Sequence, residues 1–153
     1  MTVQAAPPPV ATKADIAHAL SGEVPNGVVK SRPLAGPLEG AVIQFGRASS
    51  GLGGNDYQVL SQVAQMFRRN GGTVRIVAHA SQDVNGSSAE MIERGNYEVS
   101  KRRALVIVAQ LERMGVPKSS IIAEAASDSE PAYGTDTARG VAANRRAEVY
   151  IDF

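Results

Sequence analysis

The sequence of 153 residues contains no cysteine and no tryptophan, and only 5% of its residues are aromatic. Without cysteine there is no disulfide, no thiolate metal site and no cysteine nucleophile. An excess of one charge is also lacking, because 16 basic residues balance 15 acidic ones to a formal net charge of +1. Bulk attraction to nucleic acid is therefore not expected, and any anion site has to be local.

Long apolar runs are absent as well. None approaches the roughly 18 residues that a membrane span needs, and the first residues, MTVQAAPPPVATKAD, have neither the charged region nor the apolar core of a signal peptide. We expect either a cytosolic protein or one whose export signal or membrane anchor lies outside this sequence.

Metal chemistry is not indicated either. The two histidines, His18 and His79, lie in different regions, and no cluster of His, Asp and Glu has the spacing of metal ligands. We expect no metal and no other cofactor.

Four segments have the composition of strands. Apolar residues alternate with polar ones or form short runs bounded by turn residues, as strands require. These segments are AVIQF (41–45), TVRIVAHA (73–80), IIAEAAS (121–127) and AEVYIDF (147–153).

Two helices are predicted between the first three strands. The first ends near Arg69, and Asn55 or Asp56 is placed to cap its start. The second is predicted to begin at Ser87, which has a glutamate at capping-box spacing, and to end near Met114. SDSEPAYGTDTARG, before the last strand, is expected to form turns. The predicted order is β-α-β-α-β-β, an α/β (α+β) fold.

Proline separates the chain into two parts. Six of the eight prolines lie in residues 1–40, which are expected to form a Pro-rich extension or linker, whereas residues 41–153 suffice for one core and one domain. The second helix is apolar nearly all round at Leu105 and Val106. We therefore expect part of residues 10–40 to cover its outer side, through Ile16 and Leu20 or Val28 and Val29.

Three sequence blocks resemble the OmpA-like domain, which outer-membrane proteins, Pal lipoproteins and MotB-type stators share. VRIVAHAS stands where the family has an apolar strand ending in G-H-T-D. NYEVSKRRA matches N-x-x-L-S-x-x-R-A, and NRRAEVYI matches N-R-R-V-E-I. The resemblance covers about residues 42–153 and implies a mixed sheet packed against helices.

The resemblance also implies a function and a site. The family binds peptidoglycan without covalent chemistry, through the diaminopimelate of the stem peptide, whose free end carries an ammonium and a carboxylate. The arginine that grips the carboxylate corresponds to Arg103. Asn96 either contacts the ligand or shapes the start of the helix, and Arg145 is expected to form a wall of the pocket. The family acid that faces the ammonium corresponds to Ser81, so Asp83 is the nearest residue that could supply the missing charge.

This resemblance implies a periplasmic protein, tethered to the outer or the inner membrane through a segment outside this sequence. Peptidoglycan is the expected partner, with an envelope protein as a further one. The altered A-H-A-S block leaves an alternative, in which the domain has lost peptidoglycan binding and serves as an interaction or structural module. An enzyme is not expected, because Ser81, His79 and Asp83 form only a local cluster without the geometry of a triad.

Overall fold

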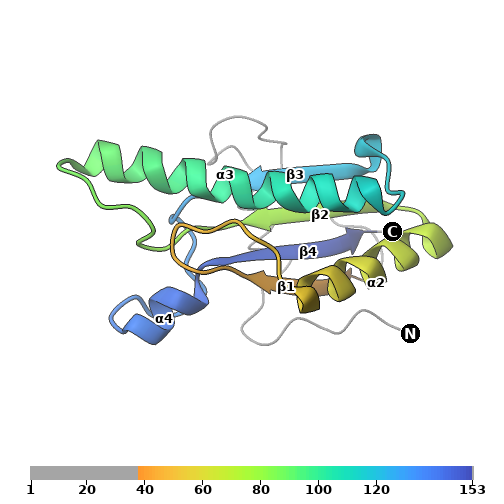
Figure 1. The fold of residues 1–153 in the computed structure, drawn as a ribbon, viewed down its shortest axis with the longest axis horizontal. Coiled ribbons are helices and arrows are strands. Elements are labelled where there is room, and N and C mark those ends of the chain that lie inside the picture. Colours follow the sequence, from red (N-terminus) through yellow and green to blue (C-terminus); the bar gives the residue numbers. More distant parts are fainter. Residues whose placement is uncertain (1–37, 153) are drawn as a thin grey trace.

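The computed structural model describes residues 38–152, which form one mixed sheet with helices (Figure 1). In chain order the elements are β1 (Leu38–Gln44), α2 (Gly54–Asn70), β2 (Thr73–Ala78), α3 (Ala89–Arg113), the 3-10 helix η2 (Lys118–Ser120), β3 (Ile121–Ala125), α4 (Ala138–Ala143) and β4 (Arg146–Asp152). The predicted fold class is confirmed. The structure adds α4, a helix of 6 residues in the segment that was expected to contain only turns.

The strands lie in the order β1-β4-β2-β3. Strand β4 is antiparallel to β1 and to β2, and β2 is parallel to β3. The last residues of β1, β2 and β3 therefore lie at the same end of the sheet as the first residue of β4. The loops that follow or precede these residues meet there, which makes this end of the sheet the place where distant polar residues are brought together.

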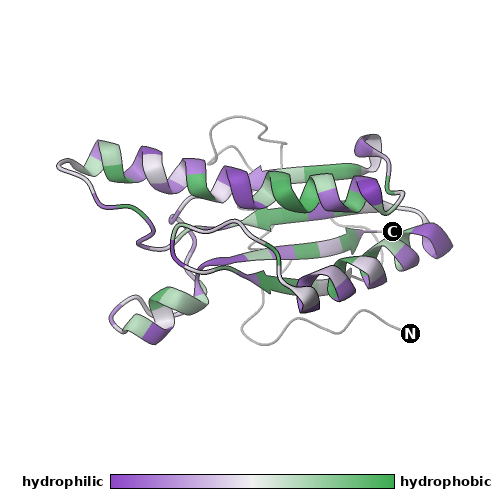
Figure 2. Cartoon of the chain, viewed as in Figure 1, coloured by the Kyte–Doolittle hydropathy of each residue, from purple (hydrophilic) through white to green (hydrophobic). Residues whose placement is uncertain are grey.

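One face of the sheet forms the hydrophobic core with α2 and α3. Every second strand residue points toward these helices, as the two-residue period of a strand requires. Figure 2 shows the apolar colour along the strands and in the second half of α3. Burying a large aliphatic side chain contributes about 1.5–3 kcal/mol. The core combines strand residues with helix residues: Ala41, Ile43, Val74, Ile76, Ala78, Ala147, Val149 and Ile151 with Leu60, Val63, Ala64, Met66, Ala104, Ile107, Val108 and Leu111.

Both long helices begin at caps that differ from the predicted residues. The N-cap of α2 is Gly53, and Asp56 instead accepts a hydrogen bond of 2.7 Å from the Gly53 N–H, as the third helical residue of a capping box does. The N-cap of α3 is Ser88, whose hydroxyl accepts from the Met91 N–H at 3.2 Å, rather than Ser87.

The outer side of α3 is open to solvent at Leu105. This side chain is 51% exposed among the described residues. Val106 is half-buried because it packs against the core from the edge. The residues that were expected to form the cover, within 10–37, lie outside the described part of the chain.

The loop between β2 and α3 rests directly on the first half of α3. A Cβ atom at Gly95 would lie 2.6 Å from Val84 Cγ1, whereas one at Gly54 would meet nothing within 4 Å. We predict that Gly95→Ala lowers the free energy of unfolding by about 1–3 kcal/mol through overpacking, although alanine favours a helix over glycine by about 1 kcal/mol.

Urea unfolding measures this difference, with Gly54→Ala as the matched control. The control is expected to be as stable as the wild type or slightly more so. Equal stability of the two variants would show that the loop does not rest on Gly95.

Candidate functional site

The candidate site lies at the end of the sheet where the loops converge. Arg103 reaches it from α3, and its side chain is completely buried, with 0% exposure. Its guanidinium carbon lies 5.1 Å from the centroid of the Phe45 ring, at the end of β1, so an aromatic face covers one side of the cation. Lys101 and Arg102, which precede it, are exposed.

All five N–H donors of Arg103 have acceptors within the protein. Nε donates to the Ser49 carbonyl at 2.8 Å, Nη1 to the His79 carbonyl at 2.9 Å and Nη2 to the Gly46 carbonyl at 2.9 Å. The remaining two donors bind the Asp83 carboxylate side by side, at 2.9 and 2.8 Å. A guanidinium has no sixth donor, so Arg103 offers no hydrogen bond to a ligand in this arrangement.

The carboxylate of Asp83 is equally occupied. Besides Arg103 it accepts from the backbone N–H of Ala48 at 2.6 Å and of Ser81 at 2.9 Å, and its side chain is 0% exposed. Burial alone raises the pKa of Asp83, but the hydrogen bonds from Arg103, Ser81 and Ala48 and the positive charge of Arg103 outweigh it, so the pKa lies below its ordinary value of 3.8. The two residues predicted to hold the opposite charges of a ligand neutralise each other.

Ser81 and Asn96 support this pair from two sides. Ser81 is 4% exposed, and its N–H is bound to Asp83. Asn96 is 0% exposed, accepts from the Asp83 N–H at 3.2 Å and donates to the Asp128 carboxylate at 3.4 Å. It therefore ties the loop after β2 to the loop after β3.

Arg145 is the predicted site residue that reaches the surface. Its Nε donates to the Ser81 carbonyl at 2.8 Å and its Nη2 to the Gln82 carbonyl at 3.3 Å. Nε also lies 3.5 Å from an oxygen of Asp83, and the side chain is 15% exposed. One edge of its guanidinium is thus fixed by the protein, while the rest borders an open cleft.

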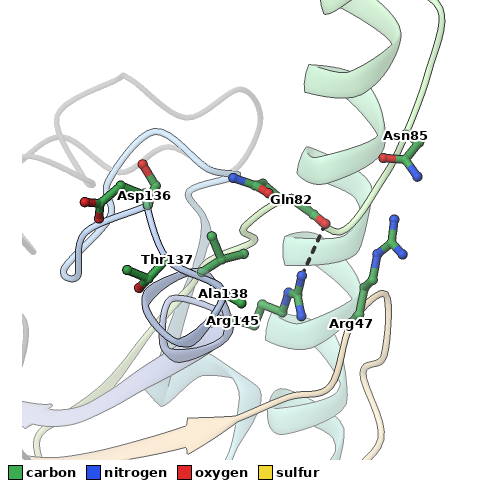
Figure 3. A pocket seen from close by; sticks show the side chains of 9 residues that line it. Arg47, Gln82, Asn85, Asp136, Thr137, Ala138 and Arg145 are labelled. Carbon is green, nitrogen blue, oxygen red and sulfur yellow. Dashed lines mark hydrogen bonds between the residues drawn. The ribbon is translucent and has the colours of Figure 1, made fainter.

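That cleft has a volume of about 490 Å³. Figure 3 shows Arg47 and Asn85 on one side of it, Asp136 and Thr137 on the other, and Gln82 and Arg145 between them. Arg47 and Asp136 are exposed and lie on the loops after β1 and before α4. Neither residue was predicted from the sequence. They lie in turn-rich loops, where the sequence alone does not distinguish a charged residue that belongs to a site from one that only faces solvent.

A second buried network fixes the start of β4. His79 Nε2 lies 2.6 Å from Glu148, which also accepts from Arg146 at 2.8 Å. Burial raises the pKa of Glu148, but the charge and hydrogen bond of His79 and the charge of Arg146 lower it by a larger amount. The pKa of Glu148 therefore lies below its ordinary value of 4.5. Asn144 accepts from the backbone of Ala132 and Tyr133 at 2.9 Å each, so the N-R-R block shapes the neighbouring loop.

Two classes of feature are not found in the described part of the chain. No group of three or more His, Cys, Asp or Glu side chains within residues 38–152 could hold a metal ion. No helix in the same range is long and apolar enough to cross a membrane.

The chain belongs to the OmpA family, whose sequence model matches residues 44–145. Members of this family are non-enzymatic binding domains. The prediction that this chain is not an enzyme is therefore confirmed. Comparison with curated protein sequences gives no match.

Solved structures share the fold. The cell wall anchor of the T6SS from Pseudomonas aeruginosa is 24% identical, with a TM-score of 0.61 over 75% of this chain and 81% of that one. The peptidoglycan-associated lipoprotein from Burkholderia pseudomallei is 21% identical, with a TM-score of 0.59 over 71% and 88%. A putative MotB-like protein from Desulfovibrio vulgaris is 16% identical, with a TM-score of 0.61 over 92% and 93%.

The first prediction from the site concerns stability. Asp83→Asn removes one partner of a buried ion pair and leaves the Arg103 charge uncompensated, which costs about 3–5 kcal/mol. We expect denaturant unfolding to show a loss of this size. The exposed residue Asp136 provides the control, because Asp136→Asn is expected to change stability by less than about 0.5 kcal/mol. Equal effects of the two substitutions would contradict a buried pair.

The second prediction concerns the stability of the protein at acid pH. Because the folded pKa of Asp83 lies below 3.8 and that of Glu148 below 4.5, both carboxyls stabilise the folded state above their unfolded pKa values and lose this contribution as the pH falls through the folded values. We expect the free energy of unfolding to be level between about pH 5 and 7 and to fall below about pH 4, by up to about 1.4 kcal/mol per pH unit for each carboxyl. Asp83→Asn should flatten the fall. An unchanged slope would exclude Asp83 as its source.

Proposed function

We propose that this chain binds peptidoglycan without covalent chemistry, through the stem peptide, and anchors an envelope protein to the cell wall. Membership of the OmpA family supports this function. So do the names of two structures with the same fold, the cell wall anchor of the T6SS from Pseudomonas aeruginosa and the peptidoglycan-associated lipoprotein from Burkholderia pseudomallei. The proposed location is the periplasm, with a tether to the outer or inner membrane through a segment outside this sequence.

The cleft beside Arg145 is the proposed ligand site. The free end of diaminopimelate is a zwitterion, which needs a cation and an anion within one small site. Arg145 and Arg47 supply two positive charges, and Asp136 supplies a negative one across a cleft of about 490 Å³ (Figure 3). In the proposed complex the ligand carboxylate binds the two arginines and the ammonium faces Asp136. A planar guanidinium suits a carboxylate because it donates two parallel hydrogen bonds.

The buried pair of Arg103 and Asp83 has a supporting role in this proposal. Direct contact between Arg103 and the ligand would require the pair to open, because all its donors are occupied. Asp83 also binds the Ser81 N–H, and the Ser81 carbonyl in turn accepts from Arg145. The pair therefore fixes the position of the arginine that contacts the ligand.

The same occupied donors favour a second candidate function. The resemblance implies that the arginine of the NYEVSKRRA block, Arg103, binds the carboxylate of the family ligand. With all its donors occupied, Arg103 cannot form that contact. The domain would then serve as a protein-interaction or structural module of the envelope.

A pull-down with purified sacculi containing diaminopimelate separates the two functions. We predict that Arg145→Ala and Arg47→Ala each weaken binding about ten- to a hundredfold, because charged hydrogen bonds contribute about 1.5–3 kcal/mol. Asp136→Asn should weaken it to a similar extent. Binding without release of hydrolysis products is expected.

Arg102→Ala is the matched control, since this arginine is exposed on α3 and lies outside the cleft. Arg103→Ala is unsuitable as a sole test, because it also destabilises the fold. Equal binding by all variants would place the ligand elsewhere. No binding by the wild type would favour the interaction module.

A further inference from the structure

Three asparagines of the chain are followed by glycine: Asn26, Asn70 and Asn85. In such a pair the backbone nitrogen of the glycine can attack the side-chain amide of the asparagine, because glycine has no Cβ atom to shield it. Whether the attack occurs in a folded protein depends on how that nitrogen is held. Asn26 lies outside the described residues, so the structure compares Asn70 with Asn85.

The first of these two pairs is protected by a helix end. Asn70 is the last residue of α2, and Gly71 is its C-cap. The Gly71 N–H donates to the Phe67 carbonyl at 2.7 Å. A nitrogen that is hydrogen-bonded back to the helix is not available to the Asn70 side chain until this end of α2 opens.

The second pair has no such protection. Asn85 and Gly86 lie in the irregular loop between β2 and α3, and both are exposed. Within residues 38–152 no hydrogen bond engages the Gly86 N–H. A Cβ atom at Gly86 would lie 3.3 Å from Met91 Cβ and from Ile92 Cγ1, so packing against α3 favours glycine here. The residue that leaves the attacking nitrogen unshielded is therefore also the one that the loop needs.

We propose that Asn85 is a site of spontaneous deamidation in the folded protein. The backbone nitrogen of Gly86 bonds to Asn85 Cγ and gives up its proton, the Cγ–Nδ2 bond breaks, and the side-chain nitrogen leaves as ammonia. Water then opens the cyclic imide at one of its two carbonyls, which gives aspartate or isoaspartate. The step consumes only water and releases only ammonia, so it needs no oxidant, reductant or enzyme.

The modified residue belongs to the proposed ligand cleft. Asn85 lines the cleft on the same side as Arg47 (Figure 3). The charged side chains of the lining are two arginines, Arg47 and Arg145, and one carboxylate, Asp136. A carboxylate at position 85 cancels the excess positive charge and replaces an amide that donates hydrogen bonds by a group that only accepts them. A weaker affinity for a carboxylate ligand follows, and this consequence rests on the proposed function, whereas the deamidation does not.

Mass spectrometry of tryptic peptides from the full chain tests the modification. Residues 76–94 and 70–75 form separate peptides with one asparagine each, so Asn70 is an internal control. In folded protein kept in mildly alkaline buffer, we expect the product to accumulate at least about tenfold faster at Asn85 than at Asn70. This factor corresponds to about 1.4 kcal/mol for opening the helix end. In urea the two rates should converge.

Asn85→Gln should leave the peptide 76–94 unmodified, because a longer side chain closes the ring less readily. Equal rates at Asn85 and Asn70 in the folded protein would overturn the proposal. So would an Asn85 that is still unmodified when Asn70 has reacted.

Retention on sacculi measures the effect on the cleft. We expect Asn85→Asp to bind about fivefold more weakly than the wild type, which corresponds to roughly 1 kcal/mol, the interaction of two unit charges about 4 Å apart in water. Asn70→Asp adds the same charge outside the cleft and should bind like the wild type. Equal retention of the two variants would show that position 85 does not affect the ligand. A wild type that is not retained would contradict the proposed function, while the mass spectra still decide whether Asn85 deamidates.

Discussion

The buried ion pair between Arg103 and Asp83 is the interaction on which the arrangement of the site depends. Removing two charges from water is costly, and the cost is offset only when every donor and acceptor has a partner. Here the five donors of Arg103 join α3 to the loop after β1, to the end of β2 and to Asp83. Asp83 in turn fixes Ser81, whose carbonyl holds Arg145 beside the cleft. The orientation of Arg145, which is partly exposed, thus follows from an ion pair that is buried.

Most of the fold could be predicted because its determinants are local. Apolar alternation marks the strands, and an apolar stripe with caps marks the long helices. Helix α4 was missed since its six residues, ARGVAA, bury only Val141 and show no periodic stripe. The cap of α3 was misplaced by one residue because Ser87 and Ser88 have the same chemistry, and only the backbone conformation of Ser88 selects it. Such choices depend on tertiary packing.

The members of the site were more predictable than their exposure. Ser81, Asp83, Asn96, Arg103 and Arg145 do lie together at one end of the sheet. A sequence shows which charges are present but not which of them neutralise each other. Three of the five donors of Arg103 are occupied by the carbonyls of Gly46, Ser49 and His79. Only the folded backbone determines where these carbonyls lie. Arg47 and Asp136 belong to irregular loops and join the cleft through the topology of the sheet.

Asp83 lies two residues after Ser81, the position at which the resemblance to the family implies an acid. Gln82, between Ser81 and Asp83, has a φ of +47°, a left-handed conformation that costs a non-glycine residue about 1–2 kcal/mol. This turn lets the Asp83 carboxylate reach back to the Ser81 N–H and across to Arg103. It also leaves the Gln82 carbonyl to accept from Arg145 at the cleft. The negative charge is therefore used inside the protein, and the cleft keeps two arginines against the single carboxylate of Asp136. The charged side chains that line the cleft therefore carry an excess of positive charge.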